Sequence, residues 1–114
     1  MELDSYTVTL LIHNPDGPSL EEAEAAAMQD MHMAHIADLA ERSQLVAAGP
    51  VLDETYRGLS ILTASPQEAL ALTASDPAVR AGLYTVDALP WRLPAGAISF
   101  RPTRFPRSLA EALE

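Results

Sequence analysis

Three histidines are the side chains of this chain best suited to chemistry near neutral pH. The sequence of 114 residues has no Cys, which excludes thiolate nucleophiles, disulfides and zinc–thiolate sites. An unperturbed imidazole titrates near pH ~6.5, so it can both give and accept protons. The histidines are His13, His32 and His35, and no Gly-rich phosphate loop or nucleophile elbow accompanies them. Proton transfer by histidine is therefore the first chemistry to consider.

His32 falls within the apolar stripe of a predicted helix. On a helical projection it lies between Leu39 and Ile36, whereas His35 falls on the flank of the stripe. A histidine in such a stripe either makes a structural hydrogen bond in the core or faces a cavity as a general acid/base. In both cases the buried imidazole needs a partner that orients it. The helical pattern by itself leaves both interpretations open.

A metal site is a weaker interpretation of the same two histidines. His32 and His35 stand three residues apart, so a helix would bring them close together. Helical zinc motifs use a spacing of four, however, and the sequence offers no evident third ligand. We therefore expect no metal and no tightly held cofactor.

Other polar and backbone features mark candidate pocket residues. Asp76 precedes Pro77, a pattern typical of a helix N-cap followed by proline at the first helical position. A capping carboxylate can also face a pocket. Gly49-Pro50 lies inside a predicted strand, where it marks a bulge, an edge or the close approach of another group. Tyr84 and Trp91 are expected in packing or in a pocket wall.

The elements that must position these residues follow a recognisable order. Apolar and β-branched runs predict strands, and capping residues, with Ser19 and Glu22 as a capping box, predict helices. The predicted strands are 5–12, 45–52, 59–63, 83–89 and, in the tail, 97–100; the predicted helical segments are 19–42, 65–75, 78–81 and 108–114. The order β-α-β-β-α-β predicts an α+β, ferredoxin-like fold with a four-stranded antiparallel sheet and two helices on one face.

The strands are more apolar than such a sheet requires. In a monomer with helices on one face only, the strands should alternate between apolar and polar residues. The segments 10–12, 45–48 and 61–62 are instead continuous apolar runs, which are typical of burial on both faces. We therefore predict a homodimer in which two sheets pack face to face.

Composition limits the partners. The net charge of −9 argues against nucleic acid, and no apolar run reaches the ~18 residues of a membrane span. With no signal-peptide pattern at the start, we expect a soluble cytoplasmic protein that binds a small organic ligand. Residues 1–54 carry eleven acids and a single Arg. The tail carries Arg101, Arg104 and Arg107 and is either a solvated extension or a segment that packs across the dimer and meets the acidic half.

The ordered set of motifs resembles the YCII-related (YciI-like) family. The resemblance covers about residues 5–92 and leaves a domain at 1–93 and an Arg/Pro-rich extension at 94–114. It rests on His32–Leu39, Leu45–Pro50, Gly58–Ile61, Ser65–Ala69, Ser75–Leu83 and Leu89–Trp91. Three positions depart from the family pattern: Ser43 replaces a common Gly, Ala78 follows Asp-Pro where an aromatic is frequent, and His35 is additional.

The resemblance implies a dimeric α/β barrel and an active-site His–Asp pair. The family His and the helical projection both select His32, and the family Asp before Pro is Asp76. It implies isomerase- or lyase-type chemistry on a small cyclic or aromatic metabolite, with Gly49, Pro50, Tyr84, Trp91 and His35 as ligand-binding candidates. The alternative is a ligand-binding or accessory dimer in which His32 is structural.

Overall fold

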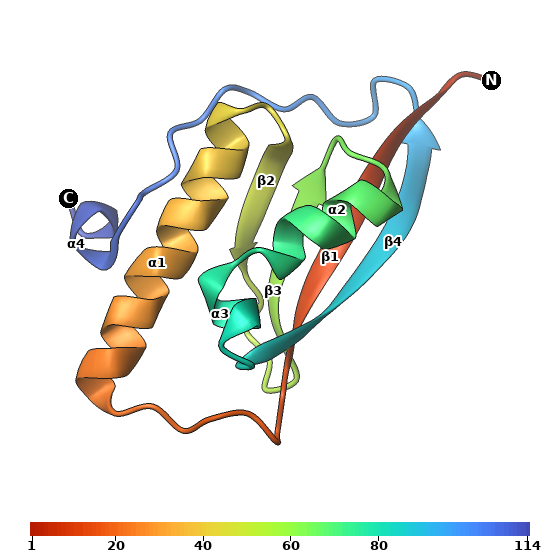
Figure 1. The fold of residues 1–114 in the computed structure, drawn as a ribbon. Coiled ribbons are helices and arrows are strands. Elements are labelled where there is room, and N and C mark those ends of the chain that lie inside the picture. The colour runs from red at the N-terminus through yellow and green to blue at the C-terminus, as the bar shows by residue number, and fades with distance from the viewer.

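The structure is an α+β ferredoxin-like fold followed by a C-terminal segment (Figure 1). The computed structural model describes all 114 residues. Its strands are β1 (Leu3–His13), β2 (Leu45–Pro50), β3 (Tyr56–Leu62) and β4 (Tyr84–Pro94). Its helices are α1 (Glu22–Glu41), α2 (Pro66–Ala74), α3 (Pro77–Arg80) and α4 (Leu109–Ala112). None of the four helices combines the length and apolar content that crossing a bilayer requires.

The sheet is antiparallel, with strand order β2-β3-β1-β4. The predicted end of the last strand at residue 89 is wrong, because β4 continues through Pro90 to Pro94 and pairs with β1 along its whole length. Proline lacks an N–H to donate, and it is tolerated here because β4 is an edge strand with only one hydrogen-bonded neighbour. The long pairing with β1 fixes β4 beneath α2 and α3.

The two long helices cover one face of the sheet (Figure 1). Between them and the sheet lies a small core made of Leu39 from α1, Leu45 and Leu62 from the strands and Ala69 from α2. Residues of β1 that share this face are Thr7, Thr9 and Leu11, all buried. The helix-covered face of β1 is therefore partly polar.

The opposite face of the sheet is apolar and has no helix over it. Val8 and Leu10 of β1 lie there, opposite Ile61 and Leu59 of β3. Leu89 of β4 pairs with Val8 on the same face and is 50% exposed. Apolar side chains of the two central strands thus lie on both faces of the sheet, since Leu11 and Leu62 are buried under the helices. This explains the continuous apolar runs in the sequence.

Helix α1 begins later than predicted. Its N-cap is Glu21, and the carboxylate of Glu24 accepts from the Glu21 N–H, so the capping box is formed by these two residues and not by Ser19 and Glu22. The short helical segment predicted at 78–81 is present as α3, and Gly82 follows it with φ of +83°.

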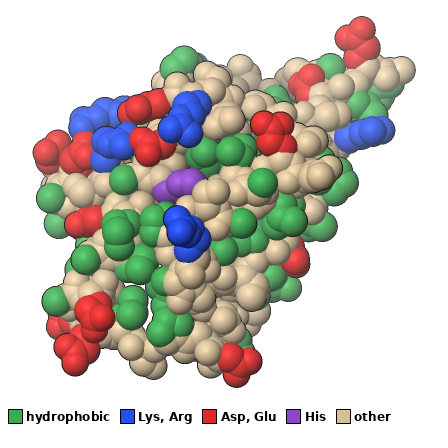
Figure 2. Space-filling view, in the orientation of Figure 1, with side chains coloured by type: hydrophobic (Ala, Val, Ile, Leu, Met, Phe, Trp, Pro, Cys, Tyr) green, Lys and Arg blue, Asp and Glu red, His purple; other side chains and the backbone are tan.

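The C-terminal segment is irregular until α4. The predicted strand at 97–100 is wrong, because no strand partner is present; Phe100 instead packs edge-on against Tyr6 with ring centroids 5.3 Å apart. The segment then passes the end of α1, where basic and acidic side chains interleave (Figure 2). Ser108 caps α4 by accepting from the Glu111 N–H at 3.1 Å. The helical turn predicted near the terminus is confirmed.

Ser43 follows α1 with φ of +60°, the conformation that normally calls for glycine. Ser43→Gly should raise the free energy of unfolding by about 1 kcal/mol, because glycine adopts this conformation without a Cβ penalty. Urea denaturation measures the change. Ser75→Gly is the matched control, since Ser75 also ends a helix but has φ of −78°; it should not stabilise. Equal effects of the two substitutions would contradict the strain at Ser43.

Candidate active site

His32 and Asp76 lie in direct contact between α1 and α3. The distance from His32 Nδ1 to Asp76 Oδ2 is 2.5 Å. The carboxylate is 1% exposed, whereas the imidazole is 19% exposed. Because an ionised carboxylate only accepts, Nδ1 carries the hydrogen and donates it to Asp76. Nε2 has no hydrogen-bond partner within the chain and is the ring nitrogen left for a ligand.

Asp76 also caps α3. Its second carboxylate oxygen, Oδ1, accepts from the Ala78 N–H at 2.8 Å, and Pro77 takes the first helical position. The cap predicted from the Asp-Pro pattern is therefore present, and it does not compete with the histidine contact. One oxygen ends the helix and the other holds the imidazole, so the backbone of α3 fixes the direction of the carboxylate.

A cavity of about 440 Å³ opens beside His32. The residues that line it come from α1, from β1, β2 and β3, and from the C-terminal segment. From α1 it is lined by Gln29, Met33 and Ile36 in addition to His32. These positions repeat at three and four residues, so one face of α1 forms a whole wall of the cavity.

The predicted binding residues divide into two groups. Gly49, Pro50 and Tyr84 line the cavity with His32. A Cβ added to Gly49 would meet no atom within 4 Å, so the packing of the chain does not require glycine there. His35 and Trp91 do not line it: His35 Nε2 lies 2.9 Å from the Leu72 carbonyl oxygen of α2, and Trp91 pairs with Tyr6 on β1.

The geometry gives the two helical histidines separate partners. His32 Nδ1 is bound to Asp76, and His35 Nε2 donates to a backbone carbonyl. No group of three or more His, Cys, Asp or Glu side chains is placed to hold a metal ion. The chemistry this arrangement supports by itself is proton transfer through His32 Nε2.

Sequence reasoning missed several cavity residues. Arg57 and Ser60 of β3 line it, as do Phe105, Pro106 and Leu109 from beyond the sheet. Arg57 could have been suspected as a basic residue close to Gly58, but nothing local distinguishes it from a surface arginine. The tail residues carry no motif, so only the folded path of the chain brings them to the site.

A tight turn positions Arg57. The carboxylate of Asp53 accepts from the backbone N–H groups of Thr55 and Tyr56, both at 2.9 Å. These backbone hydrogen bonds hold the pKa of Asp53 below its ordinary value. The Asp53 carbonyl then accepts from Arg57 Nη1 at 3.2 Å. A guanidinium is thus held at the cavity, where it can meet an anionic group on a ligand.

The comparisons place these features in a family. A family model described as the YCII-related domain matches residues 8–92, which include both His32 and Asp76. The chain belongs to the YCII-related family. A comparison with curated protein sequences finds no match.

A solved structure has the same fold as this YCII-related chain. It is 5-chloro-2-hydroxyhydroquinone dehydrochlorinase from Burkholderia phenoliruptrix AC1100, in complex with 2,5-dihydroxybenzoquinone. The TM-score is 0.53 at 20% identity, and the match covers 80% of this chain and 95% of the other. At this identity the similarity shows the fold, and the expected ferredoxin-like architecture is confirmed.

The double role of Asp76 predicts two separable effects on stability. Asp76→Ala removes the cap and the histidine partner, so the free energy of unfolding should fall by about 2–3 kcal/mol. Asp76→Ser keeps a capping oxygen and should cost about 1 kcal/mol less. Urea denaturation of the two variants gives the difference. Equal losses would show that the cap on α3 contributes nothing.

Proposed function

We propose that this YCII-related protein is a cofactor-independent enzyme that transfers a proton on a small cyclic or aromatic compound. His32 is the general acid/base and Asp76 orients it. The observation that carries the proposal is the 2.5 Å contact between the two side chains at the wall of a 440 Å³ cavity. This volume lies within the range of about 300–1,000 Å³ usual for small-molecule sites.

The carboxylate selects the reactive tautomer of the imidazole. With Nδ1–H donated to Asp76, the lone pair of Nε2 is free to accept a proton. The buried negative charge stabilises the imidazolium that forms when the proton arrives. Because Asp76 is itself held by the Ala78 N–H, little reorganisation accompanies the transfer.

The proposed step begins with removal of a proton from a ring carbon or hydroxyl by Nε2. The electron pair of the broken bond passes into the ring as an enolate or phenolate. The imidazolium then returns the proton to another atom, which isomerises the ligand, or a leaving group departs with its bonding pair, which completes an elimination. Arg57 and the hydroxyl of Ser60 line the same cavity and can bind the developing oxyanion.

The solved relative supports the class of ligand. Its name describes the elimination of chloride from a hydroxylated aromatic ring, and its ligand is a dihydroxylated quinone. Rings of this kind are planar and acidic. They match a cavity with apolar walls, one guanidinium and one histidine.

We also propose that the active form is a homodimer joined through the open face of the sheet. The isolated chain exposes 7389 Å², whereas a compact monomer of this mass exposes roughly 6,000 Å². Val8, Leu10 and Leu89 face away from the helices, while the polar Thr7 and Thr9 face them. A second copy is the occupant that fits, because a self-complementary apolar sheet face satisfies twofold symmetry.

The catalytic proposal predicts loss of turnover without loss of binding. His32→Gln should lower the rate of chloride release from 5-chloro-2-hydroxyhydroquinone by about 10²- to 10⁴-fold, because the general base is removed. The Kd for 2,5-dihydroxybenzoquinone should change much less. His35→Gln is the matched control on the same helix and should leave the rate unchanged, since His35 lies outside the cavity. Quinone binding to the wild type without turnover would favour the ligand-binding alternative.

The dimer proposal predicts that a charge on the open face separates the subunits. Leu89→Arg places a cation on that face, and sedimentation equilibrium should then report a monomer. Leu70→Arg is the control, because Leu70 is a similarly exposed leucine of α2 on the other side of the sheet, 43% exposed against 50% for Leu89. A wild-type protein that sediments as a monomer would overturn the proposal.

A further inference from the structure

The C-terminal segment forms part of the cavity wall. After β4 it crosses the end of α1 and reaches the outer side of this helix (Figure 1). Phe105, Pro106 and Leu109 line the same cavity as His32. We call residues 101–114 the strap. The family match ends at residue 92, so the strap is a feature of this chain outside the matched domain.

Ion pairs attach the strap to α1. Arg107 Nη2 donates to Asp38 Oδ1 at 2.6 Å, and Nη1 donates to Glu41 Oε1 at 3.1 Å. The hydrogen bond from Arg107 holds the pKa of Asp38 below its ordinary value. Both acids belong to the acidic half of the sequence, so the two oppositely charged halves of the chain meet within one subunit.

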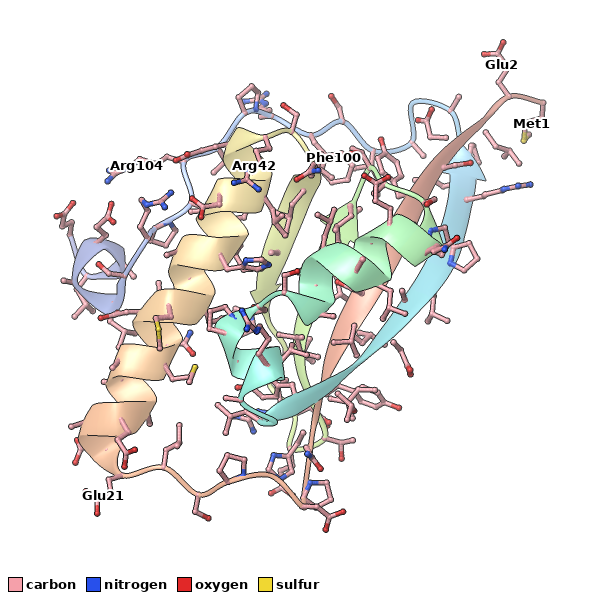
Figure 3. All side chains as sticks on the ribbon, viewed as in Figure 1. Met1, Glu2, Glu21, Arg42, Phe100 and Arg104 are labelled. Atoms are coloured by element: carbon pink, nitrogen blue, oxygen red, sulfur yellow. The ribbon has the colours of Figure 1, made fainter.

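One further contact holds the strap along the helix. Asp30 Oδ1 accepts from the Leu109 N–H at 2.8 Å. Asp30 and Asp38 are eight residues apart, so the attachment extends about 12 Å along α1. Within the strap, Arg104 pairs with Glu111, and Figure 3 shows the Arg104 side chain on the side of α1 that carries α4. The strap is therefore bound at several points.

Phe105 connects this attachment to the cavity. Its ring is partly buried and packs against the core cluster of Leu39, Leu45, Leu62 and Ala69. The same ring lines the cavity. Phe105 lies two residues before Arg107, which anchors the strap on α1. An aromatic ring fixed on the core and facing the cavity sets a firm limit to its width.

We propose that the strap is the outer wall of the site and that Phe105 determines the size of the ring that the cavity accepts. This inference rests on the proposed function only in taking a planar ring compound as the ligand. The strap shields His32 from solvent on the side that the α/β domain leaves open. Ligands that extend toward the strap come into contact with Phe105.

Ring selectivity tests the role of Phe105. The probes are 2,5-dihydroxybenzoquinone, with one ring, and 2-hydroxy-1,4-naphthoquinone, with two. The wild type should bind the first about tenfold more tightly, and Phe105→Leu or Phe105→Ala should reduce this ratio several-fold. Phe100→Leu is the matched control, because Phe100 packs on Tyr6 and does not line the cavity. An unchanged ratio in both Phe105 variants would overturn the assignment.

Chemical modification tests the wall without any ligand. Diethyl pyrocarbonate should modify His32 several-fold faster in Arg107→Gln, which loses the anchor, and in Phe105→Leu than in the wild type. The rate at His35, located by fragment mass, is the internal reference, since its Nε2 is held by Leu72 outside the cavity. Unchanged rates at His32 would contradict the proposal that the strap shields this histidine from solvent. If neither quinone binds the wild type, the proposed ligand class fails. The modification rates still test whether the strap shields His32.

Discussion

A carboxylate that is 1% exposed must have both of its oxygens satisfied, and Asp76 meets this demand with partners from two different elements. The Ala78 N–H takes one oxygen and the His32 Nδ1–H takes the other. The contact therefore connects α1 to α3. Because α3 is followed directly by Gly82 and β4, it also connects α1 to the start of β4. Removal of either partner would leave a buried polar group unpaired, so the site and the packing of these helices depend on each other.

Helix α1 lies between two structures that use different faces of it. One face of the helix supplies His32, Met33 and Ile36 to the cavity. Asp30 and Asp38 of the same helix bind the strap. The helix has no basic residue in its last turn to balance its dipole, and Arg107 from the strap supplies a cation there. The segment that contributes lining residues to the cavity thus also places a cation at the acidic end of α1.

The central strand β1 buries two threonines under the helices and carries apolar side chains on the open face of the sheet. Thr7 and Thr9 lie under the helices, and Thr7 Oγ1 donates to the Ala64 carbonyl at 2.7 Å, whereas Val8 and Leu10 lie on the side without helices. A central strand with threonines under the helices and half-buried valine and leucine on the uncovered face departs from the usual pattern of a sheet that is covered on one face only. This arrangement is the structural counterpart of the apolar runs.

The sequence alone determined the element order, the helix cap at Asp76 and the place of His32 in the apolar stripe, because these depend on periodicity and on residues close in the chain. It did not determine that β4 continues through Pro90, since edge position depends on strand order. Only the tertiary structure brought Arg57 and Phe105 to the site and Arg107 to the acidic side chains of α1. Their neighbours are tens of residues distant, and no local pattern encodes contacts that arise when α1, the sheet and the strap pack together.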